Sequence, residues 1–247
     1  MAGHINADNS ARPGRLWPFQ MNAPLAPFTL LIATRNPQKV GEIRAVLGES
    51  FRYLTLNDFP GSPAAIEDAG TFAGNAAKKA VALADWLSGI PRSAFRVPRS
   101  EIFVLADDSG LEVDALNGAP GVHSARFAAL ATGKSGNSSD AENNARLLRL
   151  LAGVPPGKRT ARFRCVLALT AVSNAPEMRT ELFEGTCEGG IGFEPRGGNG
   201  FGYDPLFVPN GWQQTFAELG QGTKNQLSHR ARALAKLKTR LGSLPNK

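Results

Sequence analysis

Apolar positions along the chain follow two periods, one typical of buried strands and one typical of helices with a single buried face. Uninterrupted apolar runs such as residues 28–33 are strand-sized, whereas apolar residues three and four positions apart predict amphipathic helices. No run approaches the roughly 18 residues that a membrane helix needs. The pattern predicts strands over residues 28–33, 102–106, 162–172 and 181–188, and helices over residues 36–47, 71–87, 140–152 and 228–242.

Helix-capping residues support these boundaries. Asn36 is a favourable N-cap and Pro37 follows at the first helical position, while Ser228 caps the last helix and Gly242 ends it. The strands over 162–172 and 181–188 are long and are expected to pair. Strands mixed with helices, without a repeat of 20–50 residues, predict an α/β fold.

The first 27 residues differ from the rest of the chain. They contain four prolines and no apolar periodicity, so we expect a disordered N-terminal extension followed by one domain over residues 28–247. Met21 is a candidate for the true start, because it leaves a short lead-in before the first strand. Residues 88–100, rich in Pro, Arg and Ser, predict a surface loop.

Composition narrows the class of protein. The chain is 42% hydrophobic and 20% charged, as is typical of globular proteins, and 28 Lys and Arg against 21 Asp and Glu give a net charge of +7. That excess favours anionic partners without choosing among them. Cys165 and Cys187 are too few for a disulfide framework, so we expect buried core cysteines and a cytoplasmic protein.

Residues 34–39 lie between the first strand and the first helix and form a candidate phosphate site. Backbone N–H groups and the positive end of the helix converge there, and Thr34, Asn36 and Lys39 add donors. The spacing of a Walker loop is absent. Many α/β proteins begin in the same way, so this signal alone is weak.

Adjacent carboxylates give a stronger signal. Asp107 and Asp108 follow a buried strand, where open α/β sheets bind ligands, and Gly110 would allow a sharp turn after them. Their mutual repulsion calls for a cation or a proton, and hard oxygen ligands suit Mg²⁺. Glu67 and Asp68, just before the second helix, could supply another carboxylate; a turn with a capping Asp is the simpler alternative.

Two further features lie late in the chain. Residues 197–205 contain four glycines in a stretch of six, and Phe201 and Tyr203 offer aromatic faces for a base. Lys224, His229 and Arg230 form a basic cluster that could instead be an ordinary surface helix. No zinc-protease or serine-hydrolase arrangement accompanies the three histidines.

Together these motifs resemble the inosine triphosphate pyrophosphatase family, also called the HAM1-like family. Six blocks match in order over roughly residues 29–241. The first block is residues 33–39 with Glu42, and the second is residues 67–80, which include Asn75 and Lys79. The other four are residues 106–116, 118–126, 200–207 and 217–230. Any one block could arise by chance, whereas the ordered set is specific.

The resemblance implies an elongated α/β fold with a long mixed sheet, two lobes and a nucleotide cleft between them. It implies Mg²⁺-dependent hydrolysis of ITP, dITP and XTP to the monophosphate and pyrophosphate, by a homodimer. It assigns the metal to Glu67 and Asp108, with Asp108 also the catalytic base. It assigns substrate binding to Thr34, Arg35, Asn36, Pro37, Gln38, Lys39, Ser109, Phe201, Gly202, Tyr203, Asp204, Lys224, His229 and Arg230.

The chain departs from the family pattern at His123, where a tyrosine is usual, and the spacing after Glu67 leaves Asp68 open as the second metal ligand. Three other functions fit the sequence less well. A nucleic-acid-binding module lacks a concentrated basic run, a phosphotransferase would usually carry a Walker-type loop, and the related Maf-like pyrophosphatases lack the Ser228–His229–Arg230 block. The ranking of ITP, dITP and XTP, and the way GTP is excluded, do not follow from the sequence.

Overall fold

A six-stranded mixed sheet forms the centre of the computed structural model, which describes residues 28–64, 66–91, 102–173 and 178–244. The strands, in the order β2-β1-β3-β4-β5-β6, are β1 (Thr29–Ile32), β2 (Arg52–Thr55), β3 (Ile102–Val113), β4 (Thr160–Ala171), β5 (Thr180–Ile191) and β6 (Phe207–Pro209). The helices are α1 (Pro37–Leu47), α2 (Phe72–Gly89), α3 (Phe127–Ala131), α4 (Asp140–Leu150), α5 (Phe216–Leu227) and α6 (His229–Gly242). The predicted α/β class with a long mixed sheet is confirmed.

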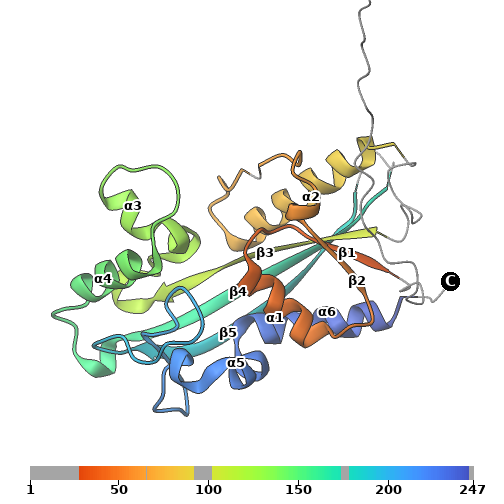
Figure 1. Cartoon of the computed structure of the whole chain (residues 1–247). Coiled ribbons are helices and arrows are strands. Elements are labelled where there is room, and N and C mark those ends of the chain that lie inside the picture. The colour runs from red at the N-terminus through yellow and green to blue at the C-terminus, as the bar shows by residue number, and fades with distance from the viewer. Residues whose placement is uncertain (1–27, 65, 92–101, 174–177, 245–247) are drawn as a thin grey trace, which may run out of the picture.

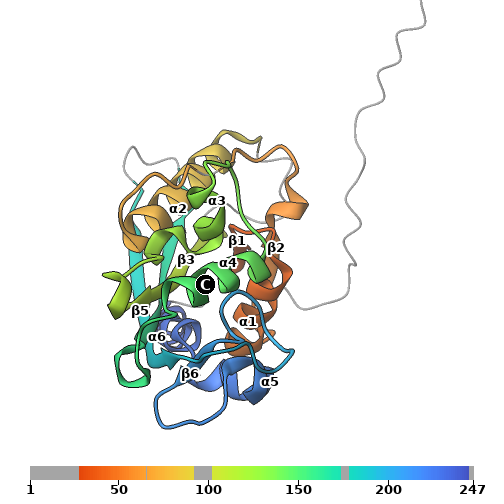
Figure 2. The same ribbon diagram turned by 90° about the vertical axis from the view of Figure 1, so that its left-hand side faces the viewer.

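The sheet is parallel at one end and antiparallel through its centre. β1 pairs parallel with β2 and β3, whereas β3, β4 and β5 form a long antiparallel meander. Apolar residues of α2 pack on one face of these strands, and those of α1 and α6 pack on the other. The molecule is elongated, with α3 and α4 at the end away from α2 and α6 (Figures 1 and 2). A third core, which includes Leu147 of α4 and Phe216 of α5, lies at that end.

The predicted helix starts are confirmed. The side chain of Asn36 accepts hydrogen bonds from the backbone N–H groups of Gln38 and Lys39, and the Ser228 hydroxyl accepts one from Ala231. α6 ends at Gly242 as expected. The two long strands pair as predicted but extend further than the apolar pattern suggested, while β2, β6 and α5 were not predicted.

The predicted end of the strand over residues 102–106 is wrong. β3 continues through the charged residues to Val113, with Asp107 opposite Leu167 and Asp108 opposite Val166 of β4. Gly110 lies within the strand and makes no turn. A Cβ at Gly110 would lie 2.4 Å from the Ser124 hydroxyl, so glycine is needed where residues 121–126 pack against β3.

Some predictions lie outside the described residues. These are the extension over residues 1–27 and most of the loop over 88–100, although α2 itself continues to Gly89. Cys165 and Cys187 are buried and unpaired, as expected. Among the described helices, none combines the length and apolar character required to cross a bilayer.

Candidate active site

The site lies where β1 ends and β3 continues. Ile32, the last residue of β1, pairs with Leu105, and in the described chain no strand pairs with that edge of β3 over residues 107–110. The chain leaving β1 turns into α1 at this point. The site therefore lies at the carboxyl end of β1, and open α/β sheets bind ligands at the carboxyl ends of their strands. The sequence therefore placed residues 34–39 correctly at the end of the first strand, but it wrongly placed Asp107 and Asp108 at the end of a strand.

Asp107 points to the α1 and α6 face of the sheet. Its carboxylate accepts hydrogen bonds from Lys39 Nζ (2.5 Å), Arg230 Nε (2.8 Å) and the Ser109 hydroxyl (2.9 Å). Cys165 Sγ also donates to it at 3.3 Å. Burial alone would raise the pKa of Asp107, but the Arg230 and Lys39 charges hold that pKa well below its usual value. Asp107 is therefore deprotonated near neutral pH.

Asp108 points to the opposite face, toward α2. Lys79 Nζ donates to its carboxylate at 2.9 Å and Asn75 Nδ2 at 3.2 Å. Burial raises the pKa of Asp108, the Lys79 charge opposes that rise, and the nearby Glu67 carboxylate adds to it. The expectation that Asp107 and Asp108 repel one another and share a cation is wrong, because successive side chains in a strand lie on opposite faces.

The side chains of Glu67 and Asp68 also have different partners. Glu67 Oε1 lies 3.0 Å from Lys79 Nζ, so Glu67 and Asp108 share one ammonium group. Arg126 also contacts Glu67, at 3.6 Å. Partial burial would raise the pKa of Glu67, but the Lys79 charge, with smaller contributions from Lys39 and Arg126, lowers it. Asp68 is exposed and pairs with Lys78 instead. The geometry favours Glu67 over Asp68 as the carboxylate that acts with Asp108.

The start of α1 presents fewer free donors than the sequence suggested. The Asn36 side chain already accepts from the N–H groups of Gln38 and Lys39, and the Thr34 hydroxyl accepts from the N–H of Asn36. A phosphate bound here would have to replace those contacts. Arg35 reaches away to Ser62, at 3.4 Å.

A buried carboxylate joins the two late basic residues. Glu42 of α1 is 4% exposed and binds Lys224 Nζ at 2.8 Å and the Arg230 guanidinium. Lys224 also binds Asp204 at 2.6 Å. Lys224 and Arg230 are therefore not a surface basic cluster: both are buried and each is shared between two carboxylates.

Aromatic rings line the remainder of the pocket. His229 stacks on Phe163 with ring centroids 4.7 Å apart, and the Phe201 ring centroid lies 4.4 Å from Lys224 Nζ. Burial together with the Arg230 and Lys224 charges lowers the pKa of His229 well below its usual value, so His229 is neutral. Tyr203 is buried, and its hydroxyl donates to the Ser124 carbonyl at 2.9 Å. The Tyr203 hydroxyl therefore braces the pocket wall.

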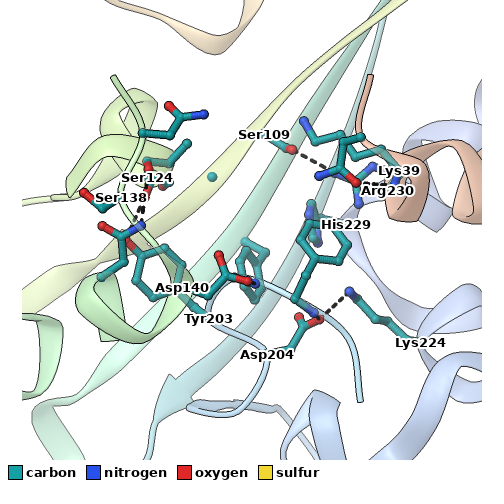
Figure 3. A pocket seen from close by; sticks show the side chains of 18 residues that line it. Lys39, Ser109, Ser124, Ser138, Asp140, Tyr203, Asp204, Lys224, His229 and Arg230 are labelled. Atoms are coloured by element: carbon teal, nitrogen blue, oxygen red, sulfur yellow. Dashed lines mark hydrogen bonds and ion pairs between the residues drawn. The ribbon is translucent and has the colours of Figure 1, made fainter. Parts of the chain in front are cut away.

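One pocket collects most of the predicted substrate-binding residues (Figure 3). Side chains from α1, β3, α5 and α6 form one side of it, and Ser124, Ser138 and Asp140 form the other. The predicted residues that line it are Asn36, Lys39, Ser109, Phe201, Gly202, Tyr203, Asp204, Lys224, His229 and Arg230. Those that lie outside its lining are Thr34, Arg35, Pro37, Gln38, Glu67 and Asp108.

Three buried polar residues beside the site had no assigned role in the sequence reasoning: Glu42, Asn75 and Lys79. A signal for the last two was present. Asn75 and Lys79 lie one turn apart on the apolar stripe of α2, and a charged residue in such a stripe is seldom buried without a partner. Asp140 was also missed; its carboxylate accepts from the Gly202 N–H at 2.7 Å and so fixes the glycine-rich loop.

The chain is similar in sequence to known proteins. The chain is 47% identical over 208 residues to a dITP/XTP pyrophosphatase of Desulforamulus reducens, covering 84% of this chain and 92% of that protein. It is likewise 47% identical to a dITP/XTP pyrophosphatase of Geobacter sulfurreducens over 214 residues, covering 86% and 96% of the two chains.

Solved structures share the fold. A HAM1 protein from Coxiella burnetii superposes with a TM-score of 0.70 at 36% identity, covering 88% of this chain and all of that one. A nucleoside-triphosphatase / dITP/XTP pyrophosphatase from Mycobacterium abscessus gives a TM-score of 0.60 at 39% identity, covering 85% and 98%. The Ham1 family model matches residues 30–240. The resemblance drawn from the motifs is thus confirmed, and the chain belongs to the Ham1 family.

Proposed function

We propose that the protein hydrolyses ITP, dITP and XTP to the nucleoside monophosphate and pyrophosphate, removing these altered nucleotides from the nucleotide pool. One observation carries the proposal: a single pocket joins Lys39 and the start of α1 to Phe201, Lys224, His229 and Arg230. The first group suits phosphates and the second suits a purine base. The names of the relatives in the same family support the same substrates.

Magnesium is part of the proposal, and the donor set fits it. Glu67 and Asp108 converge on one cation, the Lys79 ammonium, which shows that both carboxylates reach a common point. No larger cluster of metal-binding side chains occurs among the described residues. Mg²⁺ usually takes one or two carboxylates together with substrate phosphates, so two are sufficient. When bound, the ion would neutralise charge on the phosphate chain and acidify water.

Different residues of the chain would carry out different parts of the reaction. Asp108, buried and with a raised pKa, would accept the proton of the water that attacks the α-phosphorus. Lys79 orients Asp108 through a 2.9 Å contact. Lys39 would stabilise the negative charge that develops on the departing pyrophosphate, together with the N–H groups of α1 once these are released from the Asn36 side chain.

Selectivity for a 6-oxo purine would come from the donors at the base end of the pocket. Lys224, Arg230 and the neutral His229 lie there together. The adenine amino group is itself a donor and would face these donors without an acceptor, at a cost of about 1–3 kcal/mol. ITP should therefore be preferred over ATP by at least about tenfold. A homodimer and a cytoplasmic location are further parts of the proposal, supported by the family resemblance.

A product-release assay tests the proposal. The full chain is incubated with ITP, dITP, XTP, GTP or ATP, with Mg²⁺ or with a chelator, and pyrophosphate is distinguished from orthophosphate. We expect pyrophosphate from ITP, dITP and XTP with Mg²⁺ and little product from ATP. Orthophosphate as the product, or equal kcat/KM values for ITP and ATP, would contradict the proposed reaction or its base selectivity, respectively.

A further inference from the structure

Charged residues that line the pocket or lie directly behind it alternate in sign. Lys39 binds Asp107, Asp107 binds Arg230, and Arg230 binds Glu42. Glu42 in turn binds Lys224, which binds Asp204. The chain of contacts thus contains three cations and three carboxylates, so its net charge is zero. The neighbouring His229 adds no charge, because its pKa lies well below neutral pH.

Glu42 is the central carboxylate at the base end of this chain. It lies one turn after Lys39 on α1, and its two oxygens bind Lys224 and Arg230. Gln221 also approaches it, with Nε2 at 3.4 Å. Glu42 is buried and does not line the pocket, so any effect on a bound base must act through those two cations.

The two classes of substrate differ in the charge of their base. Hypoxanthine is neutral near neutral pH, whereas xanthine carries an additional acidic ring N–H and loses a proton near neutral pH. A buried anion is costly unless it is paired with positive charge. The net charge of the groups behind the pocket therefore affects the binding of XTP and ITP differently.

We propose that Glu42 is the positioning residue that balances Lys224 and Arg230, and that this balance sets the ranking of ITP against XTP. The inference rests on the proposed function, because it concerns how the same pocket ranks its substrates. With Glu42 in place, the chain of ion pairs is neutral and a neutral base meets no excess charge. Without it, the base end carries one uncompensated positive charge.

Two substitutions at Glu42 separate the effect of its charge from the effect of its side-chain shape. Glu42→Gln keeps the shape of the side chain and removes its charge, so the ratio of kcat/KM for XTP to that for ITP should rise by about tenfold. The rise should grow with pH as xanthine ionises. Glu42→Asp keeps the charge and should stay close to the wild-type ratio. The matched control Glu188→Gln removes an exposed carboxylate that pairs with Arg162, and should leave the ratio unchanged.

A second pair of variants changes the charge in the other direction. Lys224→Met removes one cation and should lower the ratio. The double variant Glu42→Gln/Lys224→Met restores neutrality, so its ratio should return toward the wild-type value even if overall turnover is lower. These variants also test the proposal if Glu42→Gln alone fails to fold, as judged by circular dichroism.

The experiment measures both turnover and binding in the full chain. Values of kcat/KM for ITP and XTP are taken from pyrophosphate release across neutral pH, and dissociation constants for IMP and XMP by calorimetry. Equal losses for both bases in folded Glu42→Gln, or a ratio in the double variant as far from wild type as in the singles, would overturn the inference. Absence of pyrophosphate release by the wild type would instead overturn the proposed function, and the IMP and XMP constants would still test Glu42.

Discussion

The adjacent residues Asp107 and Asp108 point to opposite faces of β3 and have different charged neighbours. Asp107 is held by two cations from helices distant in the sequence, and its pKa lies well below the usual range. Asp108 has one cation, which it shares with another carboxylate, and its pKa is raised. Two residues of identical chemistry thus become a fixed counter-ion and a candidate base, and the difference arises from the number of cations that each face supplies.

This difference predicts that Asp107 contributes mainly to stability and Asp108 mainly to catalysis. A fully paired carboxylate has little tendency to accept a proton, whereas one with a raised pKa is better matched to proton transfer near neutral pH. We therefore expect substitutions at the two positions to be measured best by different experiments: Asp107 by unfolding and Asp108 by turnover.

The largest effect is expected at Asp107. Asp107→Asn removes the partner of two cations, and breaking a buried ion pair costs about 3–5 kcal/mol in the free energy of unfolding. Because the folded-state pKa is lowered, this contribution is present above the ordinary aspartate pKa and is lost as pH falls through the lowered value. Urea unfolding at neutral pH measures it.

The matched control for this prediction is Asp114→Asn. Asp114 pairs with Arg162 at 2.9 Å on an exposed part of the sheet, so its loss should cost less than about 1 kcal/mol. Equal losses of unfolding free energy at Asp107 and Asp114 would show that the buried chain of ion pairs adds nothing to stability.

Asp108 should dominate turnover. We expect Asp108→Asn to lower kcat at least about 10²-fold while the protein stays folded, because an amide cannot accept the proton of the attacking water. This corresponds to about 2.7 kcal/mol in activation free energy. Steady-state kinetics with ITP, alongside a thermal melt, measure both. Near-normal turnover in the folded variant would remove Asp108 from the catalytic role.

Glu67 and Asp68 sharpen the comparison on the α2 face. Glu67→Gln should raise the Mg²⁺ concentration for half-maximal activity by at least about tenfold, since Glu67 shares the cation position of Asp108. Asp68→Asn, which affects only the exposed pair with Lys78, is the control and should leave that concentration unchanged. The reverse result would make Asp68 the metal ligand.

The smallest expected effect is a shift in the pH profile. A base acts when deprotonated, so kcat/KM for ITP should fall as pH falls through the pKa of Asp108, which sets the midpoint. The Lys79 charge lowers the pKa of Asp108, so Lys79→Met should move that midpoint up by about one unit. An unmoved midpoint in a folded, active Lys79→Met enzyme would argue against this coupling.

Local chemistry in the sequence was sufficient for much of the fold. Asn36 and Ser228 act on backbone groups two or three residues away, so their capping roles follow from neighbouring residues alone. The apolar periods predicted α1, α2, α4 and α6, because each of these helices buries a stripe that the local sequence displays. The ordered motifs also predicted which late residues would gather at the pocket.

What the sequence by itself determined was the α/β class, the starts of the predicted helices and the late residues, from Phe201 to Arg230, that line the pocket. The tertiary structure alone decided that β3 continues through Asp107 and Asp108 and that these residues face opposite sides. The physical reason is that charged residues at a buried position are stable only with partners. Those partners come from afar: Arg230 lies 123 positions from Asp107, and Lys79 lies 29 positions from Asp108.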